Sequence, residues 1–414
     1  MTVASEPRAA SDPRFSAPRF SGAHVPALDG VRGIAILLVI AYHFSVSLGI
    51  LGVGNPLLGF FRFGWCGVDV FFALSGFLIT GILLDTKDSP HYFRNFYVRR
   101  VLRIFPLYYG SLLVVFLLRL ALPQAGVWGA HGTLAAPGSL LWPLLYLQNL
   151  GVYLGGPSLS GVTTHYWSLA VEEHFYLAWP LLVWLATRRQ ITLLAMTAIV
   201  VSLLGRALVY WHGSNLEAIF GLTPLRMDGL AIGALASIAL RRQGGLEAVL
   251  PWARTVMVVA GVALAGLLAM HRMMHHTDPA MWLIGYPLVA MVTAAALLLS
   301  LRNGPVARIL SLSPLRWFGK YSFGLYVWHP IIGVILLHSH VALVPDGAGQ
   351  PAVVLAALAT LLIDLAVAWL SFHLWEKRFL DMKRFFAADT PRRLPPEAGA
   401  RIGAGVETVR VAGP

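Results

Sequence analysis

The sequence has few charged side chains, and this shortage excludes a soluble globular protein. Only 12% of the 414 residues are Asp, Glu, Lys or Arg, whereas 57% are hydrophobic. An average soluble protein has about 25% charged residues, so this chain has too few to cover a globule in water. Apolar runs of about 20 residues are long enough to cross the bilayer core as helices. The composition therefore predicts an all-α, polytopic integral membrane protein.

Cysteine and acidic residues are also scarce. The single cysteine, Cys66, has no partner in the sequence, which excludes an intramolecular disulfide and a cysteine metal cluster. Lys and Arg number 31 against 19 Asp and Glu, which gives a net charge of +12. In a polytopic protein this excess is typical of cytoplasmic loops that face anionic lipid. We therefore expect the lipid bilayer, and not nucleic acid, as the partner of these charges.

Ten apolar runs are long enough to be membrane spans, and basic residues orient them. The runs cover about 33–51, 66–84, 104–122, 167–187, 191–211, 222–240, 253–271, 281–301, 322–341 and 351–374. Clusters of Lys and Arg follow every second run, so a ten-helix layout with both termini in the cytoplasm places each cluster on the cytoplasmic side. Residues 140–154 contain Pro, Gln and Asn, and we predict a re-entrant or interfacial segment there.

Two tails flank the predicted membrane domain. Residues 1–24 lack the apolar stretch of a secretory signal and are expected to be a disordered, basic cytoplasmic tail. Residues 385–414 are rich in Pro, Gly and Ala, and we expect a second disordered cytoplasmic tail there. The membrane domain then covers residues 25–384, and the expected location is the cell membrane.

An arginine and a histidine share one face of the first predicted span. Arg32 and His43 are eleven residues apart, which is three helical turns, so their side chains lie on one face roughly 16 Å apart along the axis. Ionisable residues inside a membrane usually mark a functional site, and imidazole can accept and return a proton near neutral pH. We predict that His43 is a general base. The alternative is a neutral histidine bonded to a neighbouring helix.

Three more arginines, Arg99, Arg100 and Arg103, precede the third predicted span. Their i,i+3 and i,i+4 spacing brings guanidinium groups together on a helix, and Arg is preferred where phosphate is held by paired hydrogen bonds. With Arg32 they would form a polyphosphate site at the cytoplasmic lip, and contact with lipid headgroups is the alternative. A donor such as acyl-coenzyme A has phosphates at one end and a reactive group on a long arm. It would bind at this lip and present its acyl group to His43.

Five blocks of the sequence resemble the acyltransferase-3 family of membrane O-acyltransferases. They are Leu28-Asp29-Gly30-Val31-Arg32-Gly33 with Tyr42-His43, Gly67 to Ile79, Arg100-x-x-Arg103, Tyr166 to Tyr176, and Tyr321 to Pro330. The resemblance implies an acyl donor taken from the cytoplasmic side, usually acetyl-CoA. It also implies a catalytic histidine at His43 and donor-binding arginines at Arg32, Arg100 and Arg103. Some relatives carry a periplasmic esterase-like domain after the last span. This chain ends soon after that point, so we expect transfer to be completed within the membrane domain.

Three acidic residues inside predicted spans are candidates for the same site. Asp69 could orient His43 by accepting from its second ring nitrogen, or it could cap a helix start. Glu172 and Glu173 would be penalised if they faced lipid, so at least one must face the interior. We choose Glu172 as a catalytic residue and Glu173 as a substrate-binding residue. Ser75, with the glycine that follows it, is expected to permit close helix packing.

Aromatic and charged residues are candidates for binding a sugar. Tyr166 and Trp167, beside His165, would supply an aromatic platform at the outer entrance, although the aromatic belt of a membrane interface is the alternative for Trp167. Arg226 and Asp228 are expected to form an ion pair that lines the cavity, or one that is purely structural.

The remaining histidines have simpler interpretations. His329 precedes Pro330, which frees a backbone carbonyl group, so we expect a structural hydrogen bond there. His271, His275 and His276 cluster near the outer side without a matching second cluster, and we expect no metal site.

These features together predict an enzyme that moves an acyl group, most simply acetyl, from acyl-CoA to a hydroxyl group of a sugar-containing acceptor. The acceptor could be a surface polysaccharide, a lipid-linked glycan or a glycosylated natural product. Direct transfer with His43 as base and a route through an acyl-histidine both stay open. No permanently bound cofactor is expected. The alternative is a transporter or proton-coupled carrier of an anionic solute, in which His43 and Glu172 relay protons.

Overall fold

The computed structural model describes residues 25–47, 61–121, 141–151, 153–154, 162–213, 217–270, 278–338 and 350–386. These residues form helices and turns, and none of them lies in a strand. The first predicted tail and most of the second lie outside the described residues. Residues 385 and 386, which were expected to begin the second tail, instead end the helix η8 (Met382–Phe386).

The helices are named in chain order. They are α1 (Pro26–Ser47), η2 (Phe63–Cys66), α3 (Gly67–Asp85), α4 (Tyr92–Ala121), α5 (Leu141–Leu144), α6 (Gln148–Gly151), η5 (Thr164–Tyr166), α7 (Trp167–Leu185), α8 (Arg188–Trp211), α9 (Glu217–Gly221), α10 (Thr223–Leu240), α11 (Gly245–Met270), η6 (Met281–Gly285), α12 (Tyr286–Ser300), α13 (Pro305–Leu310), α14 (Ser313–His338), α15 (Gln350–Ser371), η7 (Phe372–Glu376), α16 (Lys377–Asp381) and η8.

Eight helical stretches of the described chain are long and apolar enough to cross a membrane. They overlap eight of the ten predicted runs with different bounds, and the other two runs, 167–187 and 322–341, overlap α7 and α14. The chain is therefore an all-α polytopic membrane protein. The count of ten spans and the cytoplasmic placement of both termini stay predictions. The described residues of the segment 140–154 form two short helices, α5 and α6, each of four residues, whereas a span needs about 20.

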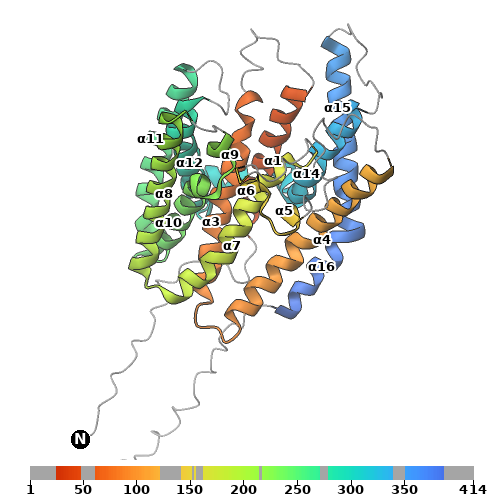
Figure 1. Ribbon diagram of the computed structural model, residues 1–414. Helices are drawn as coiled ribbons and strands as arrows, with labels where there is room; N and C mark the ends of the chain where they lie inside the picture. Colours follow the sequence, from red (N-terminus) through yellow and green to blue (C-terminus); the bar gives the residue numbers. More distant parts are fainter. Residues whose placement is uncertain are drawn as a thin grey trace, which may run out of the picture.

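The helices form a bundle with a central group between two outer groups. Figure 1 shows α8, α10, α11 and α12 on one side, α4, α15 and α16 on the other, and α1, α3 and α14 between them. Helix α7 packs against both α3 and α10. Because helices near the centre contact neighbours all round, residues far apart in the sequence meet there.

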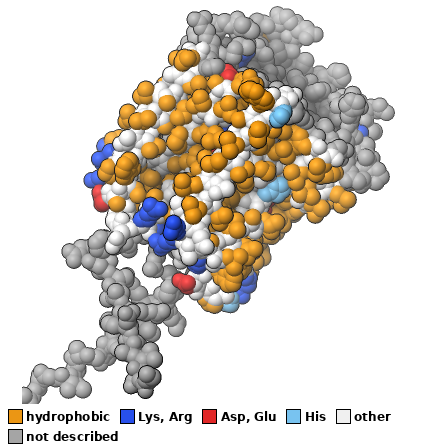
Figure 2. Space-filling model, turned by 60° about the vertical axis from the view of Figure 1, so that its left-hand side comes forward, with side chains coloured by type: hydrophobic (Ala, Val, Ile, Leu, Met, Phe, Trp, Pro, Cys, Tyr) orange, Lys and Arg blue, Asp and Glu red, His pale blue; other side chains and the backbone are white. Residues whose placement is uncertain are grey.

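The outer helices present apolar side chains to the surroundings. Leu204 on α8 and Val258 on α11 are 59% and 63% exposed. Figure 2 shows that hydrophobic side chains cover most of this face, with Lys and Arg gathered near its lower edge. An apolar surface of this extent would be unstable in water, but it matches the hydrocarbon core of a bilayer.

Three of the predicted cytoplasmic loops contact one another at one end of the bundle. Lys87 donates to the backbone carbonyl oxygen of Ala186 at 2.7 Å, and Arg188 donates to that of Arg241 at 2.6 Å. Arg241 in turn makes a bidentate pair with Asp85, with both distances 2.7 Å. The loops after the second, fourth and sixth predicted spans therefore share one end of the molecule, as the distribution of basic residues predicts.

Glycines set the closest helix contacts. A Cβ atom at Gly33 of α1 would lie 2.0 Å from the carbonyl oxygen of Leu315, and one at Gly319 of α14 would lie 1.8 Å from that of Asp29. Helices α1 and α14 therefore touch backbone to backbone, as small residues permit in membranes. This contact determines the register in which the side chains of the two helices meet.

Candidate active site

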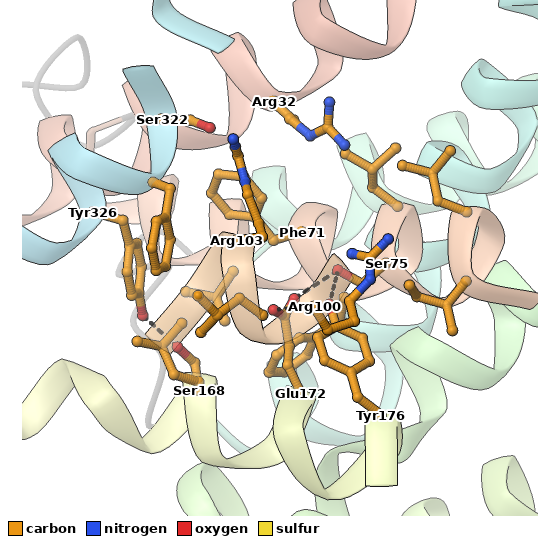
Figure 3. A pocket seen from close by; sticks show the side chains of 18 residues that line it. Arg32, Phe71, Ser75, Arg100, Arg103, Ser168, Glu172, Tyr176, Ser322 and Tyr326 are labelled. Atoms are coloured by element: carbon orange, nitrogen blue, oxygen red, sulfur yellow. Dashed lines mark hydrogen bonds between the residues drawn. The ribbon is translucent and has the colours of Figure 1, made fainter. Parts of the chain in front are cut away.

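One pocket brings together most of the arginines that the sequence analysis singled out. Arg32 comes from α1, and Arg100 and Arg103 come from α4. Figure 3 shows all three side chains around the same space. The other lining residues come from α3, α4, α7 and α14: Val68, Phe71, Phe72, Leu74, Ser75, Leu78, Ile79, Ile104, Ser168, Leu169, Glu172, Tyr176, Ser322, Phe323 and Tyr326.

Helix α4 begins earlier than the predicted third span, and this matters for the arginines. The predicted span began at residue 104, whereas α4 starts at Tyr92 and runs to Ala121. Arg100 and Arg103 therefore lie inside a continuous helix, which fixes their direction toward the pocket. Arg99, one position away on the same helix, is not among the residues that line the pocket.

The arginine end of the pocket has more cations than anions. Arg32 donates to Asp29 at 2.9 Å, and Arg100 lies over the ring of Tyr176 with Cζ 5.6 Å from the centroid. Lys383 of η8, which the sequence analysis did not consider, interacts electrostatically with Arg32, Arg99, Arg100 and Arg103. Among the residues that line the pocket, the three arginines accompany a single carboxylate, that of Glu172, while the carboxylates of Asp29, Glu173 and Glu376 interact with the arginines from outside the lining. The surplus suits a ligand with several phosphates.

Glu172 lies in this pocket, held by two hydroxyl groups. Ser75 donates to its Oε1 at 2.7 Å, and Tyr176 donates to its Oε2 at 3.2 Å. The hydroxyl oxygen of Ser75 also lies 3.1 Å from that of Tyr176, so the single hydroxyl proton of Tyr176 is shared between Ser75 and Glu172. Ser75 and Gly76 were expected to permit close packing: a Cβ atom at Gly76 would lie 1.9 Å from the carbonyl oxygen of Leu230, which confirms this for Gly76, whereas the hydroxyl group of Ser75 faces the pocket (Figure 3).

The opposite end of the pocket is aromatic and is bordered by two hydroxyl groups. Ser168 of α7 and Tyr326 of α14 hydrogen-bond to each other, and Tyr326 also donates to the carbonyl oxygen of His165 at 3.0 Å. The ring of Phe71 packs edge-on against Tyr326 with centroids 6.2 Å apart. No local sequence pattern marks Ser168 or Tyr326 as site residues. Their apolar neighbours gave no charge signal that would have revealed them.

His43 lies beyond this end and is not among the residues that line the pocket. Its Nδ1 atom is 2.9 Å from the carbonyl oxygen of Val39, one turn earlier in α1, so Nδ1 carries the proton and donates it. This assignment leaves Nε2 with a free lone pair, as a general base requires. The Nε2 atom of His329 lies 3.4 Å from the same Nδ1.

His329 makes the structural hydrogen bond that the sequence predicts. Its Nδ1 donates to the carbonyl oxygen of Leu325 at 2.7 Å. A third buried histidine, His165, lies close by, with its ring centroid 6.0 Å from that of His329. Three imidazoles from α1, η5 and α14 thus lie together beyond the aromatic end of the pocket.

The expected contact between Asp69 and His43 is not the one observed. Asp69 Oδ1 accepts from Arg226 Nη2 at 2.9 Å, whereas His43 Nδ1 contacts Val39. Asp69 lies in the first turn of α3, and the hydrogen bonds of its carboxylate and of His43 Nδ1 go to different partners. We therefore place Asp69 in a buried ion pair and not in the candidate catalytic group.

Arg226 and Asp228 do not pair with each other. Residues two apart on a helix point to different sides, so Arg226 pairs with Asp69 and Asp228 pairs with Arg206 of α8. Arg206 makes two hydrogen bonds to Asp228, at 3.0 and 2.7 Å. None of these four residues is among those that line the pocket. An arginine inside the apolar run 191–211 was a signal that should have marked Arg206.

The residues proposed as a sugar platform are buried in helix packing. Tyr166 is 0% exposed and its hydroxyl lies 2.6 Å from Ser111, while Trp167 packs against Phe220 with centroids 4.5 Å apart. Neither side chain lines the pocket, nor does Glu173. The predicted sugar-binding role of these three residues therefore has no support from the pocket geometry.

Metal binding is not indicated in the described part of the chain. No group of three or more His, Cys, Asp or Glu side chains among the described residues is placed to hold an ion. His271, His275 and His276 lie outside the described residues.

The described helices thus form an apolar bundle around a pocket lined by three arginines, and three histidines from different helices lie together beyond its far end. Comparison with known proteins identifies the family. The profile of the acyltransferase domain of the acyltransferase-3 family matches residues 25–372, and the chain belongs to this family.

Named relatives support this assignment. Peptidoglycan O-acetyltransferase OatA of Listeria monocytogenes is 28% identical over 334 residues, which cover 76% of this chain and 50% of the relative. O-acetyltransferase OatA of Staphylococcus aureus is 26% identical over 333 residues, covering 76% and 51%. The chain thus spans about half the length of these curated relatives. No solved structure matches significantly.

Proposed function

We propose that this protein transfers an acetyl group from acetyl-CoA to a hydroxyl group of peptidoglycan or a similar cell-wall sugar polymer, at the bacterial cell membrane. The observation that carries the proposal is the pocket itself. Arg32, Arg100 and Arg103 line one end of it, and the other end approaches His43. The names of the relatives support acetyl as the group transferred and a sugar polymer as the acceptor.

The donor would bind with its phosphates at the arginines and its pantetheine arm along the apolar part of the pocket. Arg32 and His43 lie on one face of α1, three turns apart, so a long flexible arm is needed to connect the two sites. In the proposed reaction, the thioester reaches His43 past Ser168 and Tyr326. An acyl phosphate is too short to bind at the arginines and place its acyl group at His43.

In the direct mechanism, Nε2 of His43 takes the proton of the acceptor hydroxyl group. The hydroxyl oxygen attacks the thioester carbonyl carbon, a C–O bond forms, and the C–S bond breaks. The departing sulfur then receives the proton from His43. The products are an acetyl ester and CoA as a free thiol. A route through an acetyl-histidine on His43 yields the same products.

The carrier alternative is less well supported. It required Glu172 and His43 to relay protons, but Glu172 is engaged with Ser75 and Tyr176 at the arginine end, while His43 contacts Val39 and His329. Family membership also favours acyl transfer. The enzyme must release one CoA for each acetyl ester formed, whereas a carrier would consume no acetyl-CoA.

The test is the variant His43→Ala in purified protein supplied with acetyl-CoA and soluble peptidoglycan fragments. A positioned general base contributes roughly 10²–10⁴-fold, so the release of CoA and the formation of ester should fall together by at least about 10²-fold. Binding of acetyl-CoA should be retained, because the phosphate contacts lie three turns away.

The matched control is His174→Ala. This variant also removes a partly buried imidazole, one that is bonded to Thr223 and does not line the pocket. It should keep most of the parental activity. If His43→Ala retained more than about a tenth of that activity, a general base worth 10²-fold could not be at this position, and Glu172 would become the leading candidate.

A further inference from the structure

We propose that His329 is the positioning residue of His43: Nε2 of His329 accepts a hydrogen bond from the Nδ1–H group of His43 and helps to hold the tautomer in which Nε2 of His43 is free to act as the base. This inference rests on the proposed function, because it assigns His43 the role of general base. Nothing in the resemblance or in the relatives' names assigns a role to His329. The sequence alone favoured a purely structural interpretation.

His329 lies on the same face of α14 as two residues that line the pocket. Ser322, Tyr326 and His329 are at i, i+4 and i+7, so they lie on one face of the helix. Ser322 and Tyr326 line the pocket, and His329 continues the same polar stripe to His43. The stripe therefore leads from the donor pocket to the candidate base.

The two imidazoles meet in an orientation that suits a hydrogen bond. Their rings are edge-on, with centroids 4.8 Å apart and planes at 75°. His329 donates from Nδ1 to Leu325, which leaves its Nε2 as an acceptor, 3.4 Å from Nδ1 of His43. The Nδ1–H of His43 is thus shared between this acceptor and the carbonyl oxygen of Val39.

This arrangement has a chemical consequence for the base. In hydrolases with a catalytic triad, an acidic side chain accepts from Nδ1 and holds the histidine in the tautomer that presents Nε2 to the substrate. Asp69 does not fill that place here, because it pairs with Arg226. His329 supplies a neutral acceptor instead. The hydrogen bond from Nδ1 of His43 to this acceptor becomes stronger when His43 is positively charged during the reaction.

The fold holds His329 in this place from several sides. The close contact of α1 and α14 at Gly33 and Gly319 sets the distance between the helices that carry the two histidines. His165 packs against His329 from η5, and Tyr326 lies one turn away with its ring centroid 6.0 Å from the imidazole. His329 itself is 2% exposed, so its orientation does not depend on solvent.

Two variants separate the positioning role from the structural one. In His329→Gln, the side-chain amide can occupy the place of Nε2, so an acceptor still faces His43 while the bond to Leu325 is lost. In His329→Asn, the amide can occupy the place of Nδ1, so the bond to Leu325 is kept while the acceptor is lost. Both variants would be measured with acetyl-CoA and soluble peptidoglycan fragments, next to His329→Ala.

We expect kcat to fall by up to about 10²-fold in His329→Ala and His329→Asn, because misplacing a reacting group causes a loss of this order. In His329→Gln, kcat should recover most of this loss. The KM for acetyl-CoA should stay within about twofold in all three variants, since the arginines are untouched. Thermal unfolding of each purified variant shows whether the fold is retained.

The opposite order would overturn the proposal. If His329→Asn restored activity and His329→Gln did not, the bond to Leu325 would be what matters, and His329 would be structural. Equal activity in all variants would also refute it. These outcomes are distinct from failure of the proposed function, in which His43→Ala itself would keep its activity.

Discussion

Arg100 is the residue at which donor binding can be tested most directly. Its side chain lines the pocket and lies over the rings of Phe96 and Tyr176. Arg100→Ala should raise the KM for acetyl-CoA, while the affinity for the acceptor changes little. Arg100→Lys should recover only part of the loss, because an ammonium group keeps the charge but lacks the planar fork that binds phosphate at two points.

The matched control for Arg100 is Arg94→Ala on the same helix. Arg94 is exposed and does not line the pocket, so its removal should leave the donor kinetics unchanged. Steady-state titrations with acetyl-CoA compare the two variants directly. Unaltered KM in a folded Arg100→Ala protein would refute the phosphate site.

The buried ion pairs give a prediction about stability. Arg206 is 0% exposed and Asp228 is 1% exposed. Removing one partner of such a pair costs about 3–5 kcal/mol, because a charge remains buried without compensation. Arg206→Leu should therefore lower the unfolding temperature strongly, whereas Arg206→Leu combined with Asp228→Leu should recover much of the loss. Thermal unfolding in detergent measures both, and an additive loss in the double variant would contradict the pairing.

At the scale of the helix, the α1–α14 contact can be tested with glycine substitutions. A methyl group at Gly33 would lie 2.0 Å from the carbonyl oxygen of Leu315, so Gly33→Ala must push the helices apart. Overpacking of this kind typically costs about 1–3 kcal/mol. Activity should fall as well, since the same contact aligns His43 with His329. Unfolding temperature and kcat are the measurements.

Gly261→Ala on α11 is the control for this prediction. A methyl group there would have nothing within 4 Å apart from its own helix. Replacing Gly by Ala in an open helical position typically stabilises by about 0.4–1 kcal/mol. If both variants behaved alike, the close approach of α1 and α14 would not be what holds the site together.

The topology of the whole molecule can be tested with cysteine labels, because Cys66 is the only natural cysteine and is buried. Labels placed at 87–95 and 241–245 should react only from the cytoplasm. Labels near 156–162 and 273–278, mostly outside the described residues, should react only from the outside. Cytoplasmic labelling near 156–162 would mean that residues 140–154 cross the membrane and that the count of ten spans is wrong.

The all-α membrane fold and the arginines that line the pocket could be predicted from the sequence. Apolar runs form membrane helices because the bilayer core contains no water. Backbone N–H and C=O groups there must therefore hydrogen-bond within their own helix. Arg32, Arg100 and Arg103 could be found because helical spacing brings their guanidinium groups together, next to an ionisable residue inside a predicted span. The basic loops could be placed at one end because cytoplasmic loops carry the excess of Lys and Arg.

Which of these residues meet depends on how the helices pack against one another. Asp69 and Arg226 are separated by 157 positions, so their pairing depends on how α3 packs against α10, which no local pattern encodes. Tyr166 and Trp167 look like an interfacial platform in sequence, but packing buries them. His329 faces His43 because α1 and α14 touch at glycines whose partners lie almost 300 residues away along the chain. Side-chain contacts across helices depend on the register between the helices, and register is a property of the packed bundle.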